Sequence, residues 1–358
     1  MWVFYVLFLV PIAIQQFTIK GHFIDFEKKN RLALLFFFIF LTVLVGLRHE
    51  LIGTDTINYV YYFESFGNES WSDLIEGFSE FGFFYFNKII YTFTNNVQVY
   101  FIVTAVVTFA MIYLIYRKSC IDPSLTIVLY CVMSTFVMAF SGIRQMLAVG
   151  IGVVAYEFTR KKKLIPFILC VVLAMTFHVS AFMIAFMYPL YYARITKKWL
   201  LVVVPLMAVT FVFNKQIFSS TVLILAQFTK YDGSIAQTGA YTMLILFVVF
   251  AVFSFIIPDD SLLDSETIGL RNLLLLSVVL QMFAPLHTIA MRMNYYYIIF
   301  IPLLIPKIIR ARSKKWEDVA VFARHIMVAF FAVYFFYNAY MGSNSLDVFP
   351  YHFFWEVV

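Results

Sequence analysis

Long apolar runs are the feature that most limits what this 358-residue chain can fold into. Repeated stretches of roughly 17–25 mostly apolar residues have the length that a helix needs to cross a bilayer. Hydrophobic residues make up 63% of the chain and charged residues 13%, which leaves too little polar surface for a soluble globule of this size. The run 32–47 does not alternate, so a transmembrane barrel is not favoured. The sequence therefore predicts an all-α polytopic membrane protein.

Polar interruptions divide the chain into about twelve predicted spans, within a range of roughly ten to fourteen. The spans are predicted at 2–18, 32–48, 98–116, 124–141, 144–159, 164–178, 179–193, 199–213, 241–257, 271–285, 286–306 and 319–337. One integral membrane domain is expected over 1–358. Two longer polar segments, 49–97 and 214–240, interrupt it, and part of the first is amphipathic enough to lie on the membrane.

The distribution of basic residues orients these spans. Most of the 26 Lys and Arg residues fall in one set of alternate loops: Lys20, Lys28, Lys29, Arg31, Arg117, Lys118, 160–163, Arg194, Lys197, Lys198, Arg271, Lys307, Arg310, Arg312, Lys314 and Lys315. By the positive-inside rule this face is cytoplasmic, and both termini and both longer segments are extracytoplasmic. The first span has no basic leader and no cleavage site, so we expect it to be retained. Because the basic residues act as topology signals, no nucleic-acid partner is predicted.

Three arginines on the outer face need a reason other than orientation. Arg48, Arg144 and Arg292 lie at or within predicted span ends, where a charge is costly unless it has a partner or a task. One interpretation is that each pairs with a nearby carboxylate or carbonyl, or reaches the interface. The other is a multiply anionic ligand, because guanidinium groups bind phosphate oxygens bidentately.

Acidic and aromatic residues surround these arginines in the sequence. The segment 49–80 contains seven Asp and Glu residues and no Lys or Arg, interleaved with aromatic residues. Such a loop suits sugars, and equally an interfacial aromatic belt with solvated acids. His178 lies at another outer helix end, where a histidine can act as a general base or simply satisfy a neighbour's hydrogen bond. Gln145, next to Arg144, adds a donor. No spacing of His, Cys, Asp and Glu indicates a metal, and no cofactor is expected.

Several short motifs in order resemble the EpsG family of exopolysaccharide-synthesis proteins, which are similar to Wzy-type repeat-unit polymerases. The resemblance covers most of the chain and rests on these motifs: Arg48 with Gly53-Thr54-Asp55 and Tyr59; Glu80-Phe81-Gly82-Phe83 with Asn87; Ile143-Arg144-Gln145; Phe177-His178-Val179-Ser180; Arg292 with Tyr296; and Pro350-Tyr351. Phe81 stands where the family has proline, which leaves the local turn open to question.

The resemblance implies a metal-independent glycosyltransferase of GT-C-like fold, in the bacterial plasma membrane, for exopolysaccharide or capsule biosynthesis. It would join undecaprenyl-diphosphate-linked oligosaccharide repeat units at the outer face, with a flippase and a chain-length regulator as partners. Cations beside a diphosphate leaving group stabilise the charge that develops in the transition state. We assign Arg144, Arg292 and Arg48 to the diphosphate. His178, or else Asp55, is expected to take the acceptor proton. Tyr59, Glu80, Gln145, Ser180 and Tyr296 are expected to bind substrate.

Other functions fit part of this pattern. A flippase or other transporter of lipid-linked oligosaccharides would also use arginines and aromatic residues, although no inverted repeat is visible. A glycan ligase would share the donor. A membrane acyltransferase would share the histidine but would need a cytoplasmic opening for its donor. A structural partner in a capsule complex is a further alternative.

Overall fold

The computed structural model describes residues 2–17, 26–71, 80–196, 198–226, 241–341 and 346–357. Parts of the two predicted extracytoplasmic segments, 72–79 and 227–240, therefore lie outside the described residues. The described chain is helical, with isolated β-bridges and no strand. It divides into two compact units, Met1–Ala185 with Val321–Val358 (unit 1) and Phe186–Ala320 (unit 2).

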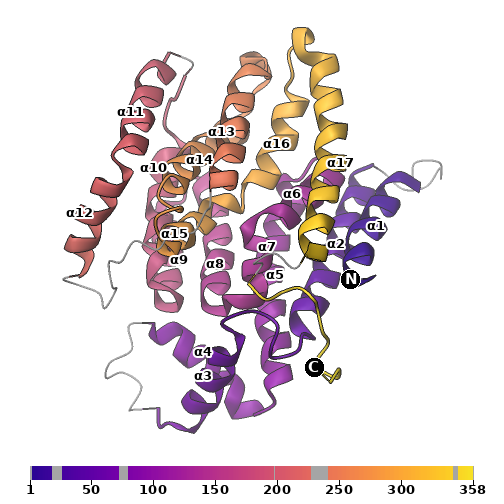
Figure 1. Ribbon diagram of the computed structural model, residues 1–358, viewed down its shortest axis with the longest axis vertical. Helices are drawn as coiled ribbons and strands as arrows, with labels where there is room; N and C mark the ends of the chain where they lie inside the picture. The colour runs from indigo at the N-terminus through magenta and orange to yellow at the C-terminus, as the bar shows by residue number, and fades with distance from the viewer. Residues whose placement is uncertain are drawn as a thin grey trace. The chain divides into compact units, whose positions relative to one another are not determined.

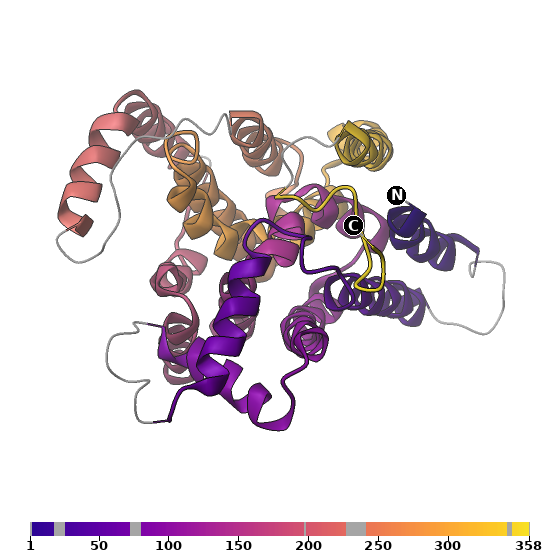
Figure 2. The ribbon, with the colours of Figure 1, turned by 60° about the horizontal axis from the view of Figure 1, so that its bottom comes forward.

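Unit 1 contains the helices that carry most of the predicted site. These are α1 (Trp2–Phe17), α2 (Phe26–Gly46), α3 (Thr56–Asn68), α4 (Phe81–Phe93), α5 (Val97–Ser119), α6 (Pro123–Val132), α7 (Ser134–Ser141), α8 (Ile143–Arg160), α9 (Leu164–Phe177), most of the 3-10 helix η2 (Val179–Phe186) and most of α17 (Glu317–Met341). Along the bundle, α1 packs on α2, α2 on α5, α5 on α8 and α8 on α9. The short helices α3 and α4 pack on each other and on the start of α5, at one end of the bundle (Figures 1 and 2).

Unit 2 contains α10 (Met187–Tyr191), α11 (Leu200–Val212), α12 (Asn214–Ala226), α13 (Tyr241–Ile256), η3 (Asp260–Leu262), α14 (Ser265–Gln281), α15 (Thr288–Ile298), α16 (Ile301–Arg310) and η4 (Lys314–Trp316). Helix α14 packs on α10, α13, α15 and α16. It begins after Asp264, whose side chain accepts a hydrogen bond from the backbone N–H of Thr267. An ion pair between Lys307 and Glu266, 3.0 Å apart, joins α16 to the start of α14.

Each of the twelve predicted spans overlaps a helix or a broken pair of helices. Among the described residues, three helices are long and apolar enough to cross a membrane, or up to six if each bent pair forms one span. Four shorter apolar helices add to these. The protein is therefore a helical membrane protein, and the number of spans within the predicted range stays a prediction.

Two predicted spans are not straight helices. The span 124–141 is broken into α6 and α7, which meet at 61°, because Met133 between them has an extended backbone (φ −75°, ψ 145°). The span 286–306 is broken into α15 and α16 at 47°. Pro302, at the start of α16, has no N–H to continue the preceding helix. A further break, at Gly142 between α7 and α8, matters most for the site. It places Ser141 at the end of α7 and Arg144 at the start of α8, beside α3 and α4.

Candidate functional site

An ion pair between Glu80 and Arg144 lies at the centre of the candidate site. Glu80 precedes α4 and Arg144 is the second residue of α8, and Oε2 of Glu80 lies 2.6 Å from Nη1 of Arg144. The Glu80 side chain is 9% exposed and that of Arg144 is 25% exposed. The pair is thus buried on the carboxylate side and partly open on the guanidinium side. Desolvation makes such a pair costly to break by removing one partner.

His178 joins the same carboxylate from a third segment. It ends α9, and its Nδ1 lies 3.6 Å from Oε1 of Glu80. The same Oε1 accepts a hydrogen bond from the backbone N–H of Val179, at 3.0 Å. Ser180 contacts the ring through its backbone N–H, 3.2 Å from Nδ1, and through its hydroxyl, at 3.0 Å. Residues 80, 144 and 178–180, far apart in sequence, therefore meet in one polar cluster.

Glycine at position 82 allows this meeting. A Cβ at Gly82 would lie 2.0 Å from Oγ1 of Thr176 and 3.1 Å from the Thr176 backbone carbon, so only glycine lets α4 approach α9 this closely. Thr176 is two residues before His178. Phe81, which stands where the family motif has proline, is half exposed as the first residue of α4, and it does not displace Glu80 from Arg144.

Aromatic rings enclose the guanidinium group of Arg144. The centroids of the Tyr59, Tyr62 and Phe83 rings lie 5.8, 5.5 and 5.8 Å from its Cζ. Cation–π contacts of this kind hold an arginine in place without consuming its hydrogen-bond donors. Nε of Arg144 is buried without a hydrogen-bond partner among the described residues. The guanidinium group is therefore held by Glu80 and by the surrounding rings, and the Arg144 side chain stays 25% exposed.

Two of these aromatic residues were not predicted as site residues. Tyr62 was part of an aromatic segment, and Phe83 appeared only as the last residue of a family motif. Their spacing contains the signal: Tyr62 follows Tyr59 by three residues and Phe83 follows Glu80 by three residues. Residues three apart share one face of a helix. Because α3 and α4 pack together, those faces meet at Arg144.

The Gly-Thr-Asp turn is anchored to the segment that precedes Arg144. Gly53 has a positive φ of 95°. The Thr56 hydroxyl donates to the carbonyls of Ile52, at 2.6 Å, and Phe140, at 3.2 Å. The backbone N–H of Asp55 donates to Oγ of Ser141, at 3.1 Å. Asp55, half buried at the start of α3, is thereby tied to a residue only three positions before Arg144.

Arg48 is fully buried, two residues beyond the end of α2. Its Nη1 donates to the carbonyl of Val45, and its Cζ lies 4.3 Å from the centroid of Phe101. Nε and Nη2 have no hydrogen-bond partner within the described part of the chain. Burial lowers the pKa of Arg48 to about 10, and Tyr100 and other tyrosines act in the opposite direction, so the group is still charged at neutral pH. Nothing in this position exposes Arg48 to a ligand, and its predicted phosphate contact stays a prediction.

The C-terminal segment binds to the backbone around Arg48. Backbone hydrogen bonds join His49 to His352, Phe354 to Leu47 and Gly53 to Asp347, at 2.9, 3.0 and 3.1 Å. The Tyr351 hydroxyl donates to the carbonyl of Leu44, at 2.9 Å. The sequence marked Pro350-Tyr351 only as a family motif. In the structure Tyr351 binds the end of α2, and the preceding tail residues Leu346 and Asp347 hold the turn at Gly53 and Thr54.

The remaining predicted residues lie in two places. Gln145, beside Arg144, is buried, with 1% of its surface exposed. Arg292 and Tyr296 are in α15 of unit 2, where Arg292 is half buried and Tyr296 is buried. On the same helix the Asn294 side chain donates to the Ser277 carbonyl and to Oε1 of Gln281, both at 3.0 Å, which is a buried polar network that the sequence did not single out.

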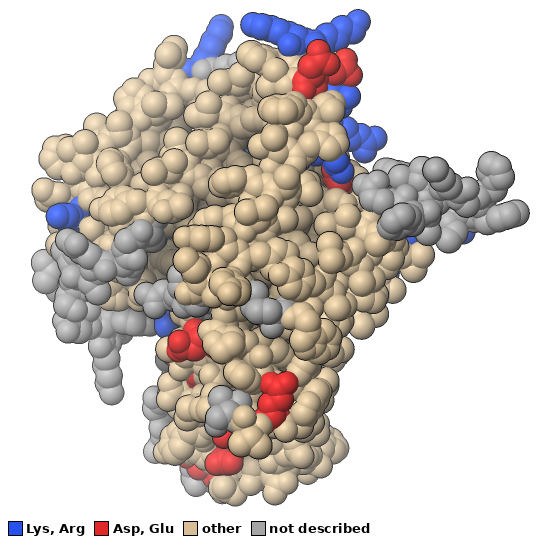
Figure 3. All heavy atoms as spheres, turned by 45° about the vertical axis from the view of Figure 1, so that its right-hand side comes forward, with Lys and Arg blue, Asp and Glu red and all other residues tan. Residues whose placement is uncertain are grey.

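The charges of unit 1 are divided between the two ends of its helices. At one end Arg160 donates to Ser119, at 2.7 Å, and Lys118 pairs with Glu157, at 2.9 Å. The opposite ends of α5 and α8 lie beside α3, α4 and the Glu80 cluster. Glu64 in α3 and Glu69 just after it are exposed. Acidic and basic side chains gather at different ends of the molecular surface (Figure 3). The two ends of unit 1 therefore differ in charge, and their orientation in the membrane stays a prediction.

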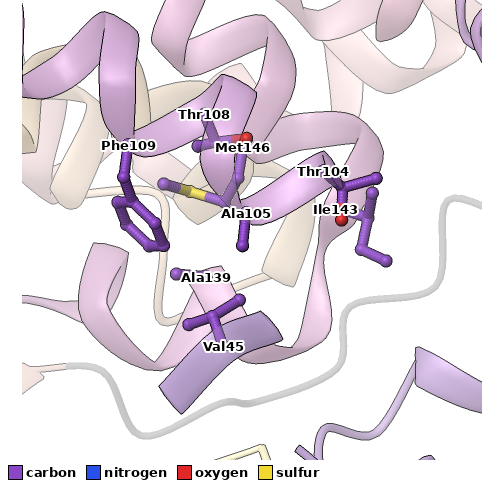
Figure 4. A pocket seen from close by; sticks show the side chains of 8 residues that line it. All are labelled: Val45, Thr104, Ala105, Thr108, Phe109, Ala139, Ile143 and Met146. Atoms are coloured by element: carbon purple, nitrogen blue, oxygen red, sulfur yellow. The ribbon is translucent and has the colours of Figure 1, made fainter. Parts of the chain in front are cut away.

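A small pocket between α2, α5, α7 and α8 lies within unit 1. Its lining is mostly apolar: Val45, Thr104, Ala105, Thr108, Phe109, Ala139, Ile143 and Met146 (Figure 4). It contains none of the charged residues of the candidate site. Among the described residues, no group of three or more His, Cys, Asp or Glu side chains could hold a metal ion.

A family model for the EpsG family matches residues 31–353, which is most of the chain and includes every predicted motif. The chain belongs to the EpsG family. Membership of the EpsG family implies a membrane enzyme of the polymerase or glycosyltransferase type that acts on exopolysaccharide repeat units. Searches of curated proteins and of solved structures found no match. The GT-C-like fold therefore stays a prediction from the family resemblance.

Proposed function

We propose that this EpsG-family protein polymerises oligosaccharide repeat units carried on undecaprenyl diphosphate, at the outer face of the bacterial plasma membrane. The observation that carries the proposal is the Glu80–Arg144–His178 cluster. It unites three family motifs at the acidic end of unit 1, opposite the basic helix ends. A charged, partly open cluster near a membrane surface suits a ligand with an anionic diphosphate and a hydroxyl-rich sugar.

The reaction is transfer of a glycan from its lipid diphosphate to a sugar hydroxyl. The acceptor oxygen attacks the anomeric carbon, the bond to the diphosphate oxygen breaks, and the diphosphate leaves with the electron pair. The Arg144 side chain is bound to Glu80 and stays 25% exposed, so it is placed to stabilise the leaving charge. The acceptor proton passes to His178 or Asp55. Within unit 1, Tyr59, Gln145, Ser180 and Glu80 are proposed to bind the sugar. The contacts of Arg48 and Arg292 with the diphosphate, and of Tyr296 with the substrate, stay predictions from the sequence.

The decisive experiment uses the purified protein in detergent with lipid-linked repeat units that have already been flipped or are freely accessible. We expect a ladder of lipid-linked products that differ by one repeat unit, also in the presence of a chelator. A transporter would leave the units unchanged, and a ligase would give single transfers onto another acceptor. Either result would refute the polymerase proposal.

Sidedness has its own test. In a variant without Cys120, Cys131 and Cys170, single cysteines would be introduced as Glu69→Cys, at the acidic end, and Lys162→Cys, in the basic turn after α8. Both positions are exposed. A membrane-impermeant maleimide added to intact cells should label Glu69→Cys and not Lys162→Cys. The opposite pattern would place the cluster on the cytoplasmic side.

A further inference from the structure

Helix α4 exposes a row of apolar side chains that the candidate site does not use. Phe81, Ile89 and Phe93 are 50, 51 and 84% exposed, and Tyr85 between them is half buried. These four residues, the α4 stripe, follow one another at intervals of four, so they lie along one side of the helix. Single exposed apolar residues are common on protein surfaces, but an ordered row of them marks a contact surface.

The α4 stripe is not needed to hold the helix in the fold. The opposite side of the helix is buried in unit 1 and carries Phe83, Phe84, Asn87 and Ile90. The only charged residue of α4 is Lys88, and it is turned toward the end of α3, where its Nζ donates to the carbonyls of Gly67 and Glu69, both at 2.6 Å. The exposed side of α4 therefore carries no charge.

The α4 stripe continues the exposed apolar surface of α9. Helix α9 has no charged residue, and its exposed side chains are all apolar, among them Leu169, Val172 and Leu173. Helix α4 lies against the end of α9, where the ring centroids of Phe86 and Phe177 are 6.0 Å apart (Figure 1). In a membrane protein, a helix that exposes only apolar side chains faces lipid. The lipid that covers α9 therefore reaches the edge of the α4 stripe.

Helix α3, which packs on α4, exposes a different kind of surface. Ile57 and Tyr61 are exposed, but Glu64 and Asn68 are exposed on the same side of the helix, and exposed Glu69 follows it. Exposed carboxylates belong in water, because moving a charge into lipid is costly. The exposed side of α3 therefore stays in water, whereas that of α4 has no charged group that water must solvate.

We propose that the α4 stripe is a membrane-contact surface, immersed in the bilayer at the boundary between headgroups and acyl chains. Helices of this kind are typically immersed by about 5–10 Å. The partner is the lipid itself, because the stripe is uncharged, adjoins the lipid-facing side of α9 and lies beside the acidic surface of α3. This contact does not depend on which reaction the protein catalyses.

The contact has a consequence for the Glu80 cluster. Glu80 directly precedes Phe81, the first residue of the α4 stripe, and its carboxylate binds Arg144. An immersed stripe therefore holds this ion pair at the lipid–water boundary, which is also where the phosphate groups of membrane lipids lie. On the proposed function, a lipid-linked diphosphate then reaches Arg144 without leaving the membrane.

Nitroxide labels measure the membrane contact directly. In the protein without its three native cysteines, single labels are attached at Ile89→Cys and Phe93→Cys on the α4 stripe, and at Glu64→Cys on α3 as the matched control. All three positions are exposed. The labelled proteins are reconstituted into vesicles of phosphatidylethanolamine and phosphatidylglycerol. Power saturation in EPR then compares how often each label meets oxygen, which concentrates in lipid, and a nickel chelate, which stays in water.

We expect the labels at 89 and 93 to meet oxygen more than the chelate, and the label at 64 to show the reverse preference. Stripe labels that are as accessible to the chelate as the label at 64 would overturn the proposal. Immobilised stripe labels that are shielded from both reagents would mean that protein, such as a second copy of this chain, covers the stripe, and would also overturn it. Phe93→Trp gives a second measurement with the native cysteines in place: the fluorescence that it adds should be quenched by lipids brominated on their acyl chains, and unquenched emission would contradict the contact.

The consequence for the cluster is tested by activity. Ile89→Asp and Phe93→Asp place a charge on the α4 stripe and should lower the rate of polymer formation several-fold in vesicles, while the rate in detergent stays that of the parent protein. Asn58→Asp, at an exposed position of α3, is the control and should change neither rate. Parent-like rates of the stripe variants in vesicles would contradict the consequence. If the parent protein forms no polymer, the proposed function fails, and the labels still decide the membrane contact.

Discussion

Replacing Gly53 by alanine should damage the site from a distance, through the backbone that carries Arg144. Gly53 has φ 95°, a conformation that costs a residue with a Cβ about 1–2 kcal/mol. The new Cβ would also lie 2.3 Å from the carbonyl oxygen of Phe140 and 2.7 Å from Oγ1 of Thr56. Restoring ordinary van der Waals separation needs a movement of roughly 1 Å. The atom that must move is backbone, so a rotamer change cannot relieve the contact.

The displaced carbonyl is at the end of α7, four residues before Arg144. A shift of about 1 Å in a group that positions a substrate can cost roughly 10²-fold in rate. We therefore expect Gly53→Ala to lower the rate of polymer formation about 100-fold and to lower the unfolding free energy by about 1–3 kcal/mol. The measurements are the rate with lipid-linked repeat units and thermal unfolding in the same detergent.

Gly53→Asn tests which of the two causes dominates. Asparagine tolerates a positive φ better than alanine does, but its Cβ meets the same carbonyl. We expect it to be as damaging as Gly53→Ala. In the control Gly150→Ala, the new Cβ at 2.6 Å meets only the terminal carbon of the Met111 side chain, which can move. Normal rates in Gly53→Ala would refute the reasoning, and rescue by Gly53→Asn would assign the whole effect to the dihedral angle.

The remaining predictions concern charge and attachment. Arg144→Lys keeps the charge but loses the planar donors, and should lower the rate of polymer formation almost as far as Arg144→Ala, by roughly 10²–10³-fold; a rate equal to that of the parent protein would show that charge alone suffices. Arg48→Met should leave the unfolding free energy equal or higher. The substitution replaces a buried charge, whose Nε and Nη2 have no hydrogen-bond partner in the described chain, by an apolar side chain. A loss above about 2 kcal/mol by denaturant titration would show that the guanidinium has a stabilising partner. Deleting 346–358 should lower polymerisation while membrane insertion, followed by fractionation, is unchanged, because the tail binds the 47–54 backbone; full activity would separate the tail from the site.

Much of the helical architecture could be predicted, because each segment that crosses the bilayer must by itself be long enough and apolar enough to do so. A helix end needs only a local signal, such as Asn96 before α5 or Asp122 and Pro123 at the start of α6, and these lie near the predicted span limits. The break at Met133 was missed, since nothing in the apolar run 124–141 marks it. The helices α3 and α4 were foreseen only as a polar segment with an amphipathic part.

The candidate residues could be named from the sequence, but not their relations. Glu80 was predicted to bind sugar, and the structure shows it joined to Arg144 and close to His178. Arg48 was grouped with Arg144 as a phosphate ligand, whereas the fold buries it against Phe101. The difference follows from packing: an arginine at a span end carries the same local signal whether the neighbouring helix covers it or leaves it partly open.

The sequence by itself determined the class of protein, the family and the set of polar residues at the helix ends. Apolar length, charge asymmetry and motif order are local or additive properties, and they can be read without knowing which segments touch. Only the tertiary structure decided that 80, 144 and 178 share one cluster, that the tail holds the Gly53 turn, and that Arg48 is buried. Those facts depend on contacts between segments distant in sequence, and such contacts are set by how the helices pack.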